Sequence, residues 1–161
     1  MILQRVELKD LSFESIDSVL ALSPAPESQR FVEPVARTIA LSLVGNNLGY
    51  PGFFQVIHCD DEPVGVILLG RAPVADDEPE ILQRYGYVYR LMGFFVDQRH
   101  TGQGIGRAAL HLALDRLDTD LPIYLECHED NAAAHTLYLS VGFEDINVRL
   151  DDGDLILVRF P

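Results

Sequence analysis

The residues best suited to chemistry form a run of glycines between an apolar stretch and a stretch rich in alanine and leucine. Gly102, Gly104 and Gly106 lie within residues 99–107, directly after the apolar residues 91–96. Glycines at a strand-to-helix turn remove the Cβ atoms that would keep a ligand away from the backbone. The free N–H groups and the positive dipole end of the following helix then point at one place. The sequence therefore predicts a binding site for a pyrophosphate.

The spacing of the glycines separates three kinds of phosphate loop. A P-loop needs a lysine directly after its last glycine, and none is present here. A dinucleotide-binding Gly-x-Gly-x-x-Gly pattern fits loosely from Gly104, with Ala109 in place of the third glycine and Glu126 as the acidic residue further along. The pattern Arg-x-x-Gly-x-Gly, which begins at Arg99, fits without adjustment.

A second motif follows later in the chain. It comprises a predicted strand that ends near Glu126, Asn131 at a predicted helix start, and Leu-Tyr-x-x-x-Gly-Phe at residues 137–143. In this order, the two motifs resemble those of the GNAT N-acetyltransferase superfamily, and the order of predicted elements agrees with that superfamily from end to end. The resemblance implies an acyltransferase that uses acetyl-CoA as co-substrate and needs no metal. It would transfer an acetyl group to a primary amine by direct attack on the thioester.

The N-terminal half suggests a closer relationship within this superfamily. Residues 29–40 resemble the Phe-Val-x-Pro-x-x-x-Ser-Leu-Ala segment of bacterial spermine, spermidine and diamine acetyltransferases, and residues 90–99 are similar to their central strand. Glu33, Thr38 and an aspartate-rich loop depart from that pattern. The resemblance implies a di- or polyamine acceptor. The alternatives are an amino acid, an aminoglycoside-like compound, a protein N-terminus, or a regulator that binds acyl-CoA without catalysis.

The superfamily resemblance also implies roles for single residues. Tyr138 would protonate the departing thiolate, since a hydroxyl of pKa about 10 suits a thiolate of about 8.5. Glu126 would deprotonate the amine through water, with its pKa raised by burial. The alternatives are a core tyrosine and a solvated carboxylate at a strand end. The residues expected to bind acetyl-CoA are Phe95, Val96, Arg99, Gly102, Gln103, Gly104, Ile105, Gly106, Arg107, Asn131 and Tyr138. Those expected to bind the amine are Glu33, Glu126 and Asp130.

These residues must be positioned by an alternating series of strands and helices. Apolar periodicity and turn residues predict strands at residues 2–8, 53–59, 64–70, 87–96, 122–127, 143–150 and 154–160. Helices are expected after Ser12 or Ser15, from Pro34 to Gly45, from the glycine turn to Leu117, and over 131–141, with a loop over 72–84. This order predicts an α/β fold with a mixed, mostly antiparallel seven-stranded sheet and about four helices on both faces. The resemblance adds a splay between the fourth and fifth strands.

Composition limits the class of protein. A chain of 161 residues, 48% of them hydrophobic, suits a single N-acetyltransferase domain over residues 1–161. The net charge of −13 argues against nucleic acid, which is bound by neutralising phosphates. The sequence contains no long apolar run and no signal-peptide pattern, and its histidines and two cysteines show no metal spacing. We therefore expect a cytoplasmic enzyme that acts on a small-molecule amine away from membranes. For its oligomeric state we consider a homodimer.

Overall fold

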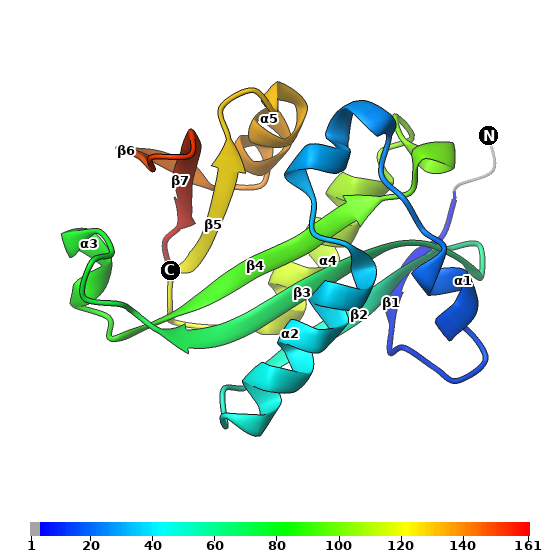
Figure 1. The fold of residues 1–161 in the computed structure, drawn as a ribbon, viewed down its shortest axis with the longest axis horizontal. Helices are drawn as coiled ribbons and strands as arrows, with labels where there is room; N and C mark the ends of the chain where they lie inside the picture. The colour runs from blue at the N-terminus through cyan, green and yellow to red at the C-terminus, as the bar shows by residue number, and fades with distance from the viewer. Residues whose placement is uncertain (1–3) are drawn as a thin grey trace.

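The computed structural model describes residues 4–161 and contains a seven-stranded sheet in the order β1-β2-β3-β4-β5-β7-β6 (Figure 1). The strands are β1 (Val6–Lys9), β2 (Gly52–Cys59), β3 (Glu62–Pro73), β4 (Tyr87–Val96), β5 (Ile123–His128), β6 (Glu144–Arg149) and β7 (Asp154–Arg159). The helices are α1 (Ile16–Leu20), α2 (Val35–Asn47), α3 (Glu80–Gln83), α4 (Ile105–Leu117) and α5 (Ala132–Ser140), with the short 3-10 helices η1 (Pro26–Phe31) and η2 (Gln98–His100). The predicted first strand includes residues 2 and 3, which lie outside the described residues.

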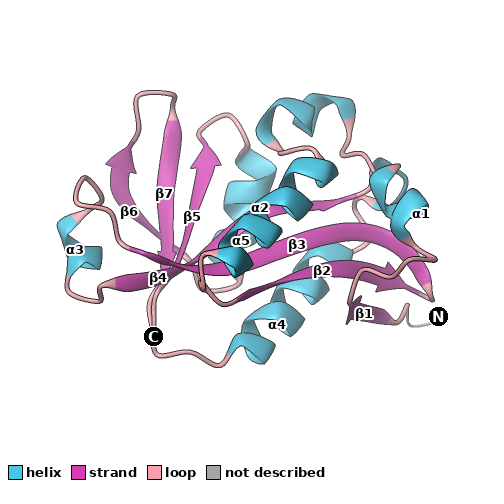
Figure 2. Cartoon of the chain, turned by 60° about the horizontal axis from the view of Figure 1, so that its bottom comes forward, coloured by secondary structure: helices cyan, strands magenta, loops and turns pink. Residues whose placement is uncertain are grey.

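The sheet divides into two parts between β4 and β5, which form the only parallel pair of strands within the described chain. Strands β4 and β5 are paired at Tyr89 with Ile123 and at Arg90 with Tyr124, whereas all other neighbours are antiparallel. Beyond Arg90 the two strands diverge, and β5, β6 and β7 stand away from β1–β4 (Figure 2). The splay between the fourth and fifth strands is therefore confirmed. In residues 4–161, the edge of β4 after Arg90 has no strand beside it.

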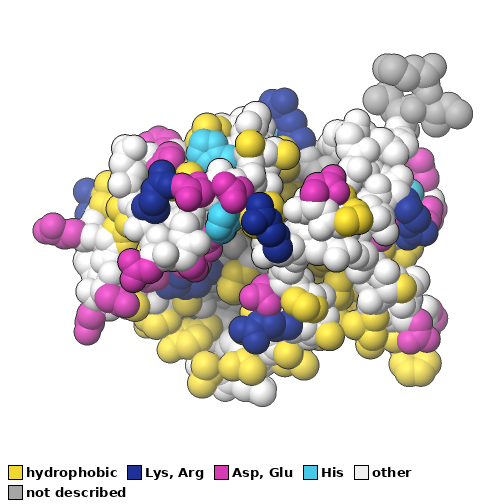
Figure 3. All heavy atoms as spheres, turned by 45° about the horizontal axis from the view of Figure 1, so that its top comes forward, with side chains coloured by type: hydrophobic (Ala, Val, Ile, Leu, Met, Phe, Trp, Pro, Cys, Tyr) yellow, Lys and Arg dark blue, Asp and Glu magenta, His cyan; other side chains and the backbone are white. Residues whose placement is uncertain are grey.

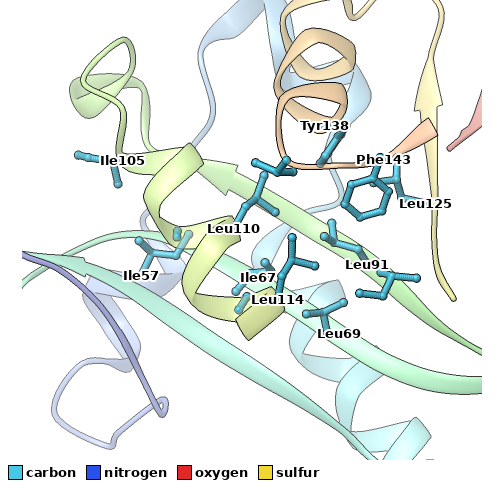
Figure 4. Packing of buried hydrophobic residues seen from close by; sticks show 14 of the residues in the cluster. Ile57, Ile67, Leu69, Leu91, Ile105, Leu110, Leu114, Leu125, Tyr138 and Phe143 are labelled. Carbon is cyan, nitrogen blue, oxygen red and sulfur yellow. The ribbon is translucent and has the colours of Figure 1, made fainter. Parts of the chain in front are cut away.

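Helices cover both faces of the sheet because its strands alternate apolar side chains between the two faces. Val56 and Val66 pack with α1 and α2, and the neighbouring residues Ile57 and Ile67 point to the opposite face. The larger core on that second face joins β2–β5 to α4 and α5 (Figure 4). Its main members are Ile57, Ile67, Leu69, Leu91, Ile105, Leu110, Leu114, Leu125, Tyr138 and Phe143. The predicted arrangement of helices on both faces is confirmed.

Helix α2 extends past Gly45, where the sequence predicts its end, to Asn47. Gly45 sits in ordinary helical conformation, and an added Cβ would approach only the Tyr50 carbonyl, at 3.9 Å. The left-handed residue beyond the helix is Gly49, with φ +77°. The position of a glycine thus predicts a helix end only where the backbone needs a positive φ.

The segment 72–84, predicted as a loop, contains regular structure at both ends. Strand β3 continues to Pro73, which is paired with Tyr87 at the start of β4. Helix α3 begins after Pro79 and buries Leu82 completely against Val88 and Tyr124. The polar, acidic composition of this segment favours a loop. The pairing of β3 with β4 and the burial of Leu82 stabilise regular structure at its two ends instead. No helix in residues 4–161 is long and apolar enough to cross a membrane.

Candidate active site

The turn between β4 and α4 has the backbone conformation that its glycines predict. Gly102 and Gly104 have φ values of +74° and +78°, and Gly104 is the N-cap of α4. An added Cβ at either position would meet no protein atom within 4 Å, so the space in front of the turn is open. A Cβ on Gly106 would instead lie 3.5 Å from Phe94 Cζ. Gly102 and Gly104 therefore shape the turn, while a Cβ on Gly106 would make only ordinary van der Waals contact.

A cavity of about 710 Å³ lies where β4 and β5 separate. Its walls come from the segment that contains η1, the end of β4, the glycine turn, the end of β5 and the inner side of α5. The predicted residues that line it are Glu33, Phe95, Val96, Gly102, Gly104, Ile105, Gly106, Arg107, Glu126, Asn131 and Tyr138. Arg99, Gln103 and Asp130 do not line it. The structure thus brings together both motifs and most of the predicted site.

Arg99 is engaged within the protein. Its Nε lies 2.8 Å from Asp97 Oδ1, and its Nη1 lies 3.9 Å from Glu62. Asp97 is 2% exposed and accepts further hydrogen bonds from the backbone N–H groups of Ser23 and Arg99. Burial acts to raise the pKa of Asp97, but these hydrogen bonds outweigh it and hold the pKa below its usual value. Arg99 therefore points to Asp97 and Glu62 in this structure, and its predicted contact with acetyl-CoA stays a prediction.

Gln103 has a partner within the protein, because its Oε1 accepts a hydrogen bond from Gln4 Nε2 at 2.9 Å. This contact directs the side chain toward the N-terminal segment instead of the cavity. Arg107, which is also predicted to bind acetyl-CoA, lines the cavity beside the glycine turn.

The central strand carries an irregularity beside the cavity. Phe95 is paired with Val66 and Met92 with Leu68, so Gly93 and Phe94 together face the single residue between Val66 and Leu68. Gly93 has φ +62°, and a Cβ there would lie 2.4 Å from the side chain of the buried Thr38. This bulge bends β4 where its edge is unpaired. Backbone groups near Phe95 and Val96, predicted to bind the cofactor, lie at the end of that edge.

Two of the three residues predicted to bind the acceptor amine form ion pairs with arginines. Glu33 lies 2.8 Å from Arg37, and Asp130 lies 3.3 Å from Arg30. Glu126 is exposed, so the prediction that it is buried is wrong. The alternation of β5 explains this, because its neighbours Leu125 and Cys127 belong to the core on one face of the strand and Glu126 lies on the other face. Glu126 Oε1 accepts a hydrogen bond of 2.6 Å from the hydroxyl of Tyr124.

Helix α5 presents Asn131 and Tyr138 to the same cavity, as their spacing predicts. Asn131 is the N-cap of the helix, and its Oδ1 accepts a hydrogen bond from Ala134 N–H at 3.3 Å. Tyr138 is 8% exposed and packs edge-on against Phe143. Burial, together with the nearby Cys127 thiol, raises the pKa of Tyr138, which keeps its hydroxyl protonated at neutral pH. This group can therefore donate a proton or a hydrogen bond into the cavity.

Other residues of the site were not predicted from the sequence. His128 and Asp154 are paired across β5 and β7 and line the cavity beside Glu126. Burial raises the pKa of Asp154, and the nearby carboxylates of Asp152 and Glu126 add to this effect. The ring of His128 packs on Phe31 of η1, with centroids 5.2 Å apart. The turn at Asp151 could have predicted the place of Asp154 in the site, because it indicates a hairpin whose second strand begins at Asp154.

Charged side chains of both signs and histidines lie next to one another on the face shown in Figure 3. The Arg30–Asp130 and Arg149–Glu129 pairs belong to the segments around η1, β5 and β6. In residues 4–161, no three His, Cys, Asp or Glu side chains come together as a metal site.

Residues 21–143 match the model of the acetyltransferase (GNAT) family. This chain belongs to that family. It is 35% identical over 85 residues to the N-alpha-acetyltransferase RimI of Mycobacterium tuberculosis. That match covers 53% of this chain and 46% of the relative, so the chain spans about half the length of this curated relative. Membership confirms the predicted family and enzyme class, an acyltransferase, and the relative's name offers no support for a polyamine acceptor.

Solved structures agree with the fold. The PaiA N-acetyltransferase of Thermoplasma acidophilum, in complex with coenzyme A, has a TM-score of 0.67 at 16% identity, covering 98% of this chain and 99% of that chain. The ribosomal-protein-S18-alanine N-acetyltransferase of Escherichia coli has a TM-score of 0.59 at 19% identity, covering 96% of this chain and 92% of that chain. The predicted fold class is thereby confirmed, with five α-helices in residues 4–161 where about four were expected.

Proposed function

We propose that this protein is an acetyl-CoA-dependent N-acetyltransferase that binds acetyl-CoA in the cavity between β4 and β5. The observation that carries this proposal is the left-handed glycine turn at the start of α4, which borders the same cavity as Tyr138 and Glu126. A helix N-terminus with open glycines suits a pyrophosphate. The unpaired edge of β4 suits the amide groups of an extended pantetheine arm, which can hydrogen-bond to it as a strand would.

The residues around the cavity have properties that suit the steps of acyl transfer to an amine. Backbone N–H groups on the unpaired edge of β4 polarise the thioester carbonyl as the amine attacks. The Tyr138 hydroxyl, protonated because it is buried, gives a proton to the departing thiolate sulfur. Glu126 receives the proton that the ammonium must lose, directly or through water, because its carboxylate lines the cavity and is exposed.

The acceptor that the site favours is the α-amine of a peptide or protein. The curated relative is named as an N-alpha-acetyltransferase, which supports an acceptor of this kind. Glu33 and Asp130 are paired with Arg37 and Arg30, so their negative charges are already partly neutralised and attract a second ammonium less strongly. A peptide N-terminus carries one ammonium at the reacting end and needs no such second site.

A polyamine is the second candidate, and one observation favours it. Asp154 and Glu126 line the cavity together, and the charge of Glu126 helps to raise the pKa of Asp154. A further ammonium near these two carboxylates would relieve their repulsion. The Michaelis constant for such a dication would rise with ionic strength, because salt screens exposed charge pairs.

The test measures free thiol released from acetyl-CoA in the presence of different amines. The panel contains short peptides with a free α-amine, the same peptides blocked at the N-terminus, and spermidine. We expect release with the free peptides and background with the blocked ones. Release with spermidine alone would overturn the peptide assignment and support the polyamine. Background release with every amine in the panel would contradict the proposed activity.

A further inference from the structure

We propose that Tyr124 is a positioning residue for Glu126, and this inference rests on the proposed function. The Tyr124 hydroxyl donates a hydrogen bond of 2.6 Å to Glu126 Oε1. It is the one hydrogen bond that the Glu126 side chain makes within residues 4–161. One carboxylate oxygen is therefore held by the protein, and Oε2 is left to receive the proton of the acceptor amine.

The place of the two residues on β5 explains why this contact forms. Residues two apart on a strand point to the same face, so Tyr124 and Glu126 lie side by side along the strand. Tyr124 is opposite Arg90 in the last residue pair of β4 and β5, directly before the strands separate. Glu126 lies two residues further, where the cavity has opened. The tyrosine thus anchors the carboxylate from the closed end of the cavity.

The ring of Tyr124 is itself fixed in position. It is 4% exposed and packs with Leu82, Val88 and residues of β7. The Arg90 guanidinium lies 4.8 Å from its ring centroid, and Arg90 also forms an ion pair with the largely buried Glu78. An exposed carboxylate on a strand would otherwise sample several rotamers. A hydrogen bond from a rigid donor restricts Glu126 to one of them.

Tyr124 remains a donor over the working pH range. Burial raises the pKa of Tyr124, and the hydrogen bond to Glu126 and its charge add to this, while the charge of Arg90 acts in the opposite direction. The cavity that Glu126 lines is also lined by Asp154 from β7, His128 from β5, and Arg30 and Glu33. The charges of Arg90 from β4 and of Glu78 from the segment before α3 act on Tyr124. Among these groups, only Tyr124 hydrogen-bonds to Glu126.

The test compares the steady-state kinetics of the wild type with those of Tyr124→Phe, which keeps the ring and removes the hydroxyl. The hydrogen bond holds one oxygen of Glu126 in place, so its loss should slow proton removal from the acceptor amine without weakening the binding of acetyl-CoA. We expect kcat to fall about 10- to 100-fold, with the KM for acetyl-CoA unchanged. Tyr85→Phe is the matched control, because the Tyr85 hydroxyl hydrogen-bonds only to Arg84 within the described chain.

Two further measurements separate positioning from a general loss of stability. In a Glu126→Gln background, Tyr124→Phe should lower the rate no further, because the two residues act through one contact. The Tm of Tyr124→Phe should stay close to that of the wild type, because the ring and its packing are kept. An unchanged kcat in Tyr124→Phe, or an equal loss of rate in the Glu126→Gln background, would overturn the positioning role. Failure of the proposed function is distinct, because the wild type itself would then release no thiol.

Discussion

At the scale of single residues, the surroundings of Tyr124 and Tyr138 differ in the hydrogen bonds that their hydroxyls make. Burial raises the pKa of both phenols, so both stay protonated at neutral pH. The hydroxyl of Tyr124 is committed to Glu126, whereas Tyr138 lines the cavity from α5 with no protein hydrogen bond to its hydroxyl in residues 4–161. Only Tyr138 is therefore free to give its proton to a leaving group.

Replacing Tyr138 by Phe should lower turnover by about 10²- to 10⁴-fold, the usual contribution of a positioned acid. The affinity for acetyl-CoA should remain nearly intact, because the ring and its packing on Phe143 are kept. Steady-state rates of thiol release measure the first effect, and titration with acetyl-CoA measures the second. Tyr50→Phe, outside the cavity, is the control. Full activity of Tyr138→Phe would show that the phenol is structural.

The sequence predicted the placement of single site residues correctly where that placement depends on local geometry. Asn131 and Tyr138 are seven positions apart, close to two helical turns, and both line the cavity. The pairing of Arg99 with Asp97 could not be predicted, because it depends on the backbone of η2 and on a contact with Ser23, far along the chain. The spacing of Tyr124 and Glu126 was a usable signal, since alternate residues of a strand share a face.

At the scale of the elements, Asp97 joins the end of β4 to the segment after α1. Its carboxylate is the N-cap of η2 and also accepts a hydrogen bond from Ser23 N–H at 3.0 Å. These bonds hold its pKa below the usual value although burial opposes them. Asp97 therefore stabilises the fold above the pKa of an unfolded aspartate, about 3.9, and this contribution is lost as pH falls toward the folded value.

Asp97→Asn should lower the free energy of unfolding by about 1–3 kcal/mol at pH 7, because a buried acceptor site is lost. The difference from wild type should shrink as the pH is lowered below about 4. Urea unfolding at neutral and acidic pH measures both values. The exposed Asp76→Asn is the control and should show neither effect. A difference between Asp97→Asn and wild type that stays constant with pH would contradict the role of the charge.

Elements were predicted well where strong local signals mark their ends. The bounds of β4 agree with the sequence, and α4 ends at Leu117 as expected, because the glycine turn separates them. The extension of β3 and the formation of α3 were missed, because both depend on partners distant in sequence. Pro73 is in a strand because it is paired with Tyr87, and Leu82 is in a helix that buries it under β4 and β5.

At the scale of the whole molecule, the cavity lies where the two parts of the sheet separate. Two residue pairs of β4 and β5 connect the parts through the sheet. Across the opening, Phe31 packs on His128 and Arg30 lies 3.3 Å from Asp130. The splay between β4 and β5 was predicted from the resemblance to the family. No local sequence pattern could have predicted it, because such a pattern carries no information on the distance between two strands. A ligand in this space contacts both parts and should stabilise the fold as a whole.

The binding of acetyl-CoA, measured through thermal unfolding, tests the account most directly. At about 100 times its dissociation constant, acetyl-CoA should stabilise the wild type by about 2.7 kcal/mol, which raises Tm by about 5–10 °C. Gly104→Val places a branched side chain in the open space before α4 and should abolish this rise. Gly49→Val is the matched control, since Gly49 has the same left-handed φ, of +77°, and open surroundings but lies away from the cavity.

Both variants should be less stable than wild type, because valine is strained at a positive φ. Only Gly49→Val should keep the ligand-dependent rise in Tm. A wild type whose Tm does not respond to acetyl-CoA, or a Gly104→Val variant that responds as the wild type does, would contradict the binding of acetyl-CoA at this turn.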